Sequence, residues 1–164
     1  FGRTAAGDIV PYFVDLGCAC QLLQTGDVPG DRGSMEYSSI RSAIGGERHE
    51  GDDLEAIGWM LVHGYCGNLP WFAWLADFYK LDATEESYAA QRQQVLHRVQ
   101  EAKMALLDIG WAAFGAIWEG STDLPQKLKD YLNACRSSTA KPPTIEVLLD
   151  MLATGGVTAA EQTE

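Results

Sequence analysis

The sequence predicts a mainly helical domain with a short β element at its N-terminus. Three observations predict this fold class. Residues 56–62, AIGWMLV, carry no charge on any side, which is typical of a helix buried in protein. Residues 88–107 and 123–136 place apolar side chains at helical spacing. Residues 9–14, IVPYFV, have the composition of a strand, and Pro11 restricts that strand to an edge or an irregular position.

The uncharged run belongs to a helix that we expect at the centre of the domain. Its first turn holds Asp52, Asp53 and Glu55, where carboxylates meet exposed backbone N–H groups and the positive end of the helix dipole. Gly67 is expected to end the helix, and Pro70 prevents it from resuming. The run is too short to span a bilayer, so burial within the protein is the better interpretation.

Shorter segments surround this helix in the sequence. Residues 24–33, QTGDVPGDRG, predict a surface loop, and residues 36–44 predict a short helix. Thr84 is expected to cap the long helix, and residues 144–153 predict the last one. The apolar positions at helical spacing are Val95, Val99, Ala102 and Leu106 in the long helix, and Leu124, Leu128, Tyr131, Leu132 and Cys135 in the later one.

Length and charge limit the classes of partner. A chain of 164 residues fits one domain with its own core. The net charge of -11 argues against a nucleic-acid-binding surface and against binding to anionic membranes. The N-terminal sequence FGRTAAGDIV has neither an initiator methionine nor an apolar signal segment, so we expect the chain to be part of a longer one.

The four cysteines indicate an intracellular protein, in the cytoplasm or the nucleus. Cys18, Cys20, Cys66 and Cys135 are too few for a disulfide framework in a chain of this length. Cys18 and Cys20 could supply two ligands of a zinc site. The nearest further ligands, His63 and Cys66, form only a weak pair, so a zinc site is disfavoured. Reduced thiols are the expectation.

Four motifs carry a resemblance to a known family. They are Asp-Leu-Gly at 15–17, Gly-Ser-Met-Glu-Tyr-Ser-Ser-Ile at 33–40, Asp-Leu-Glu-Ala-Ile-Gly at 53–58 with Gly-Asn-Leu-Pro-Trp at 67–71, and Tyr-Leu-Asn-Ala-Cys-Arg-Ser at 131–137 with Lys-Pro at 141–142. In this order they resemble the C-terminal lobe of a protein kinase, and more narrowly the casein kinase I and vaccinia-related kinase group. The resemblance covers most of the chain, although residues 72–118 match poorly.

The resemblance implies a function and a set of site residues. It implies that residues 1–156 are part of a protein kinase domain, with a tail at 157–164, that transfers phosphate from ATP to protein Ser or Thr with Mg²⁺. Asp15 would then hold Mg²⁺, Ser34 would help to hold the catalytic aspartate, and Asp53 would brace the catalytic loop, while Gly17 and Gly58 would be structural. Local sequence leaves simpler interpretations open: a strand-end turn for Asp15, a loop serine for Ser34 and a helix-capping acid for Asp53.

Asp-Leu-Gly at 15–17 resembles the family's Asp-Phe-Gly motif. In the family the other catalytic motifs come before Asp-Phe-Gly, whereas only fourteen residues precede Asp15 here. The chain has no Gly-rich phosphate loop, no strand lysine and no His-Arg-Asp loop. We therefore expect it to be inactive alone and marginally stable, with Asp53 buried beside an absent partner. The alternatives are a pseudokinase or scaffold that binds a partner protein through the aromatic loop from Trp71 to Tyr79, and a gene fragment with no function.

Overall fold

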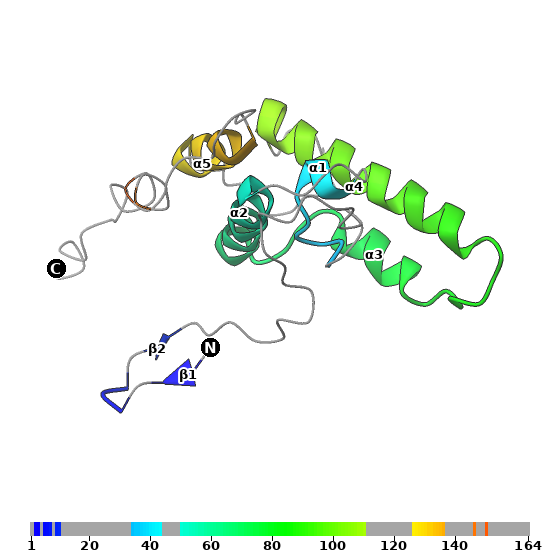
Figure 1. The fold of residues 1–164 in the computed structure, drawn as a ribbon, viewed down its shortest axis with the longest axis horizontal. Helices are drawn as coiled ribbons and strands as arrows, with labels where there is room; N and C mark the ends of the chain where they lie inside the picture. The colour runs from blue at the N-terminus through cyan, green and yellow to red at the C-terminus, as the bar shows by residue number, and fades with distance from the viewer. Residues whose placement is uncertain are drawn as a thin grey trace, which may run out of the picture.

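The computed structural model describes residues 2–3, 5–7, 9–10, 34–43, 50–110 and 126–136, together with positions 146 and 150. These residues are mainly helical (Figure 1). Strands β1 (Gly2–Arg3) and β2 (Ile9–Val10) form an antiparallel pair, in which Gly2 lies opposite Val10. Most of the strand predicted at 9–14 lies outside the described residues.

The predicted central helix is α2 (Glu50–Cys66). It ends where it was expected to, because Gly67 takes a positive φ of 77° and its N–H donates to the His63 carbonyl at 2.8 Å. A residue with a Cβ is strained in this conformation, so glycine suits the end of the helix. Helices α1 (Ile40–Ala43) and α5 (Gln126–Arg136) both pack against α2.

The prediction that α2 is buried on every side is wrong. Trp59 and Val62 are fully buried, but the side chains on another face of the helix are exposed. These exposed apolar residues are Ile57, Met60, Leu61 and Tyr65. A lack of charge in the sequence shows that a helix can be buried all round, but the number of elements that pack on it decides how much of it is buried.

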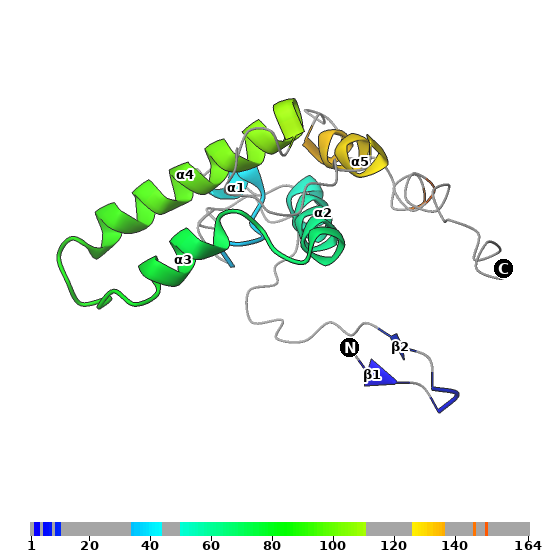
Figure 2. The same ribbon diagram turned by 180° about the vertical axis from the view of Figure 1, so that it is seen from behind.

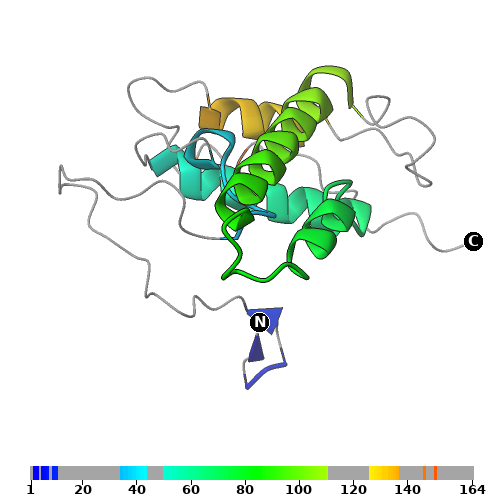
Figure 3. The same cartoon turned by 90° about the vertical axis from the view of Figure 1, so that its right-hand side faces the viewer.

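Helices α3 (Phe72–Phe78) and α4 (Tyr88–Ile109) form the other half of the helical body. They lie side by side and are joined at one end by a short connection, as Figure 2 shows from behind. Helix α4 runs at a steep angle to α2 (Figure 3), and α1 contacts both of them. The short helix α1 is therefore held between the two longest helices.

The long helix and α5 bury most of the apolar residues that the sequence indicated, although Val95 is only half-buried and Leu124 lies outside the described residues. Val99, Ala102 and Leu106 are buried in α4, and α5 buries Leu128, Tyr131, Leu132 and Cys135. Thr84 does not cap the long helix, which begins at Tyr88. The backbone N–H and hydroxyl of Thr84 instead both donate to the Asp82 carboxylate, at 2.9 and 2.7 Å. That local turn satisfies Thr84 before the helix starts.

The short helix predicted at 36–44 is only four residues long. A turn precedes it, in which the Ser38 N–H donates to the Ser34 carbonyl at 3.0 Å. The predicted surface loop at 24–33 and most of the last helix predicted at 144–153 lie outside the described residues.

Candidate functional site

The structure describes three of the five residues that the resemblance singles out. Ser34 is exposed, and its hydroxyl donates to the carboxylate of Glu36. Asp53 lies on α2 and is exposed, whereas Gly58 is buried in the same helix. Asp15 and Gly17 lie outside the described residues.

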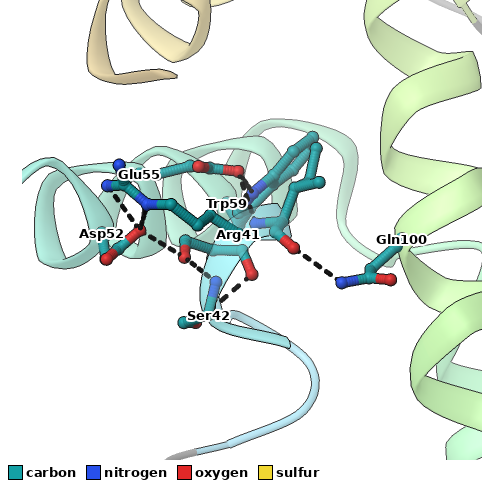
Figure 4. Close-up of polar contacts among 8 residues, drawn as sticks. Arg41, Ser42, Asp52, Glu55, Trp59 and Gln100 are labelled. Carbon is teal, nitrogen blue, oxygen red and sulfur yellow. Dashed lines mark hydrogen bonds and ion pairs between the residues drawn. The ribbon is translucent and has the colours of Figure 1, made fainter. Parts of the chain in front are cut away.

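The buried acid at the start of α2 is Asp52, and the expectation that Asp53 is buried is wrong. One carboxylate oxygen of Asp52 accepts a hydrogen bond from the Ser39 hydroxyl at 2.7 Å. The same oxygen accepts from Nε and Nη2 of Arg41, at 3.2 and 3.0 Å (Figure 4). Asp52 therefore ties the turn before α1, and α1 itself, to the central helix.

Glu55, one turn further along α2, holds the same segment by its backbone. Its carboxylate accepts from the Ile40 N–H at 3.0 Å and from the Trp59 indole N–H at 3.1 Å. Only 2% of its surface is exposed. Burial raises the pKa of Glu55 above its usual value, although these two hydrogen bonds and the more distant charges of Arg136 and Lys103 act in the opposite direction.

Helix α4 holds the opposite side of this segment. Gln100 donates through Nε2 to the Ile40 carbonyl at 2.6 Å (Figure 4), and Lys103 donates through Nζ to the Ser38 carbonyl at 2.6 Å. The ammonium of Lys103 also lies 5.3 and 5.4 Å from the ring centroids of Trp59 and Trp71. Burial lowers the pKa of Lys103 to about 7, and the charges of Glu55 and Glu36 only partly offset this shift.

The turn at 35–37 is attached to the end of α2 and to the segment that follows it. The Tyr37 hydroxyl and Nδ1 of His63 are hydrogen-bonded at 2.7 Å, and both rings contact Phe72. The Trp71 indole N–H donates to the Glu36 carbonyl at 3.1 Å. Trp71 also packs edge-on against Trp59, with ring centroids 5.6 Å apart, so residues 67–71 and the turn share one core.

Helix α5 meets α2 at Gly58. A Cβ at Gly58 would lie 2.5 Å from Cδ2 of Leu132 and 2.9 Å from Cε1 of Tyr131. The Tyr131 hydroxyl donates to the Leu54 carbonyl at 2.9 Å. Glycine at this position therefore lets the two helices approach closely.

The aromatic residues from Trp71 to Tyr79 do not form an exposed loop, so the expected contact surface for a partner is mostly absent. Trp71 and Phe78 are buried in the core. Phe72 and Trp74 are half-buried and pack against that core, while Tyr79 is 54% exposed. Trp74 and Phe78 of α3 contact Arg98 and Tyr88 of α4. Trp71 and Phe72 instead pack against Trp59 and His63 of α2.

Sequence reasoning missed four of the residues that organise this region: Asp52 and Glu55 as acceptors, and Gln100 and Lys103 as donors. A signal for Lys103 was present in the sequence. It follows Val99 by four positions and precedes Leu106 by three, so it lies on the apolar face of α4. A lysine on such a face is rarely buried unless its charge has partners, which makes it a candidate for a specific role.

Replacing Asp52 by asparagine is expected to lower the free energy of unfolding by about 1 kcal/mol, because a charged acceptor is lost in a buried network. Asp53→Asn is the matched control: it removes the same charge from the neighbouring, exposed position and is expected to leave stability unchanged. Urea denaturation of both variants measures the difference. Equal effects would show that Asp52 stabilises the protein only through its contribution to the net charge.

The described residues also limit other classes of site. No three His, Cys, Asp or Glu side chains among them are arranged to hold a metal ion. Across the same part of the chain, none of the helices has both the length and the apolar character needed to cross a membrane. Compared with models of known protein families, the sequence matches none.

Proposed function

We propose that this chain is the C-lobe portion of a serine/threonine protein kinase, which transfers phosphate from ATP to protein hydroxyl groups as part of a longer chain. In this proposal Ser34 helps to hold the catalytic aspartate, and Asp53 braces the catalytic loop from the exposed side of α2. Asp15, which lies outside the described residues, would hold the Mg²⁺ that binds together with ATP. When bound, Mg²⁺ would offset the negative charge of the phosphates.

One observation carries this proposal. The resembling motifs are far apart in the sequence, yet their described parts contact one another around α2. Within the motif at 33–40, the Ile40 N–H donates to Glu55 and the Glu36 carbonyl accepts from the Trp71 indole. The Tyr131 hydroxyl donates to the Leu54 carbonyl. A chance resemblance of short motifs gives no reason for such contacts, whereas a shared fold brings its motifs to one place.

The exposed apolar face of α2 supports the same proposal. It holds Ile57, Met60, Leu61 and Tyr65, and Asp53 is exposed at the start of the same helix. A helix that braces a catalytic loop needs a surface on which that loop can pack. In the longer chain that we propose, the exposed side of α2 supplies this surface.

Phosphoryl transfer by a longer chain tests the proposal. The purified 164-residue chain is expected not to transfer phosphate from ATP, because positioning and charge stabilisation supply most of the rate and the catalytic loop is missing. A chain extended upstream by about 150 residues, the size of one domain, is expected to be active, and Asp15→Asn in that chain is expected to abolish activity.

The residues that precede Phe1 in the open reading frame give an independent check. A strand lysine and a His-Arg-Asp loop there would support the kinase. Their absence, or an extended chain that folds without binding ATP or transferring phosphate, would favour a pseudokinase or scaffold. Activity of the 164-residue chain by itself would contradict the proposal as stated.

A further inference from the structure

Two side chains of α4, three positions apart, hold one short stretch of backbone. Lys103 donates to the Ser38 carbonyl and Gln100 donates to the Ile40 carbonyl, both at 2.6 Å. Both donors are buried, with 1% and 4% of their surfaces exposed. Ile40 also bonds to Glu55 of α2 through its N–H. Ser38 directly precedes Ser39, whose hydroxyl bonds to Asp52 of α2.

Apolar packing does not explain the lysine. A methionine would fill similar space beside the rings of Trp59 and Trp71 without the cost of burying an amine. The amine instead donates to the main-chain carbonyl of Ser38, a contact that does not depend on the side chain at this position. What the contact fixes is the position of the backbone.

The position of the Ser38 backbone also affects the position of Ser34. The Ser38 N–H donates to the Ser34 carbonyl at 3.0 Å, so the two ends of the turn are hydrogen-bonded to each other. At its other end the segment continues into α1, where the Ala43 N–H donates to the Ser39 carbonyl at 3.2 Å. A shift of the backbone at Ser38 would therefore move Ser34 as well as the start of α1.

We propose that Lys103 and Gln100 are positioning residues, which fix the backbone of Ser38 and Ile40 to α4 and thereby set the location of Ser34. The importance of that location for phosphoryl transfer rests on the proposed function, whereas the positioning itself does not. The titratable groups that act on Lys103 are Glu55 of α2 and Glu36 of the turn. Both are acids, so they favour a charged donor at Lys103.

Amide hydrogen exchange of this chain, resolved by residue with NMR, tests the proposal. The reporters are the N–H groups of Ser38, Ile40, Ser42 and Ala43, and the reference is the set of amides of α5. In Lys103→Met the amides of α5 report the general loss of stability, and the reporters are expected to exchange at least about tenfold faster beyond the rise seen in α5, because a hydrogen bond from a charged donor is lost at their segment. Lys80→Met, at an exposed lysine, is the control and is expected to change neither set.

Carbonyl chemical shifts separate positioning from general stabilisation. Lys103→Met is expected to move the ¹³C shift of the Ser38 carbonyl, and Gln100→Met that of the Ile40 carbonyl. Gln100→Met also serves if Lys103→Met does not fold, since it removes one contact and leaves the buried amine in place. Unchanged carbonyl shifts, or exchange that rises equally in the reporters and in α5, would overturn the proposal.

These measurements need no nucleotide, so their outcome is independent of the kinase proposal. An extended chain without phosphoryl transfer would defeat the proposed function and leave the positioning role intact. Conversely, unchanged reporters in both variants would defeat the positioning role, whatever activity the extended chain has.

Discussion

Replacing Gly58 by alanine is expected to lower the free energy of unfolding by about 2 kcal/mol, although alanine is the better helix former by about 1 kcal/mol. The added Cβ would lie 2.5 Å from Leu132 Cδ2 and 2.9 Å from Tyr131 Cε1. Both side chains are buried, with 0% and 2% exposed, so neither has space to move into. Helices α2 and α5 must therefore separate or repack. Thermal or urea denaturation measures the change.

Gly64→Ala is the matched control for this substitution. Gly64 lies in the same helix, and a Cβ there would meet no atom within 4 Å. Alanine at Gly64 is therefore expected to stabilise the protein by about 0.5–1 kcal/mol through helix propensity alone. If both alanines stabilised the protein equally, the close approach of α2 and α5 at Gly58 would be refuted.

Lys103→Met is expected to lower the free energy of unfolding by about 3 kcal/mol at pH 7, because it leaves a buried carbonyl without its donor and a buried acid without its nearby positive charge. The carbonyl is that of Ser38, and the acid is Glu55. Lys80→Met is the control: the Lys80 side chain is 73% exposed, and its pairing with Asp77 is expected to contribute nothing measurable.

The cost of this substitution is expected to depend on pH. Burial lowers the pKa of Lys103 from 10.5 to about 7. Between these values the unfolded chain binds one more proton than the folded chain, so the stability of the wild type rises with pH, by at most about 1.4 kcal/mol per unit. Below pH 7 both states bind the proton and the full penalty of burial applies. Lys103→Met lacks this titration, so the difference in stability between wild type and variant should widen from pH 7 to pH 9.

The titration of Glu55 does not imitate this effect. Burial raises its pKa above 4.5, so in the window above pH 4.5 the folded state binds the extra proton and stability falls as pH rises. That slope has the opposite sign and begins at acidic pH. Urea denaturation at pH 7, 8 and 9 makes the comparison, and a constant difference between wild type and variant would show that Lys103 stays charged throughout.

The expectation of marginal stability loses its original reason. It rested on Asp53 as a buried acid without partners, and Asp53 is exposed. The buried acids are instead Asp52 and Glu55, and both accept hydrogen bonds from the segment at 39–41. Any weakness of the chain is more reasonably sought on the exposed apolar face of α2, because apolar surface left in water gives no stabilisation.

The sequence by itself determined the helical class, the end of α2 at Gly67 and the buried faces of α4 and α5. These features depend on local chemistry: the period of apolar residues, and the freedom of glycine to adopt positive φ. The same rules misplaced the cap of α4 at Thr84, because a nearby carboxylate, Asp82, competed for its hydrogen bonds.

Only the tertiary structure decided which acid of α2 is buried and which lysine of α4 is held inside. Asp52 and Asp53 are adjacent and chemically identical, but successive residues on a helix point about 100° apart, so one faces the segment at 39–41 and the other faces away. Lys103 has its partner 65 positions earlier in the chain, at Ser38. Sequence periodicity reports the face of a helix, whereas the identity of the group that meets that face is set by packing between distant segments.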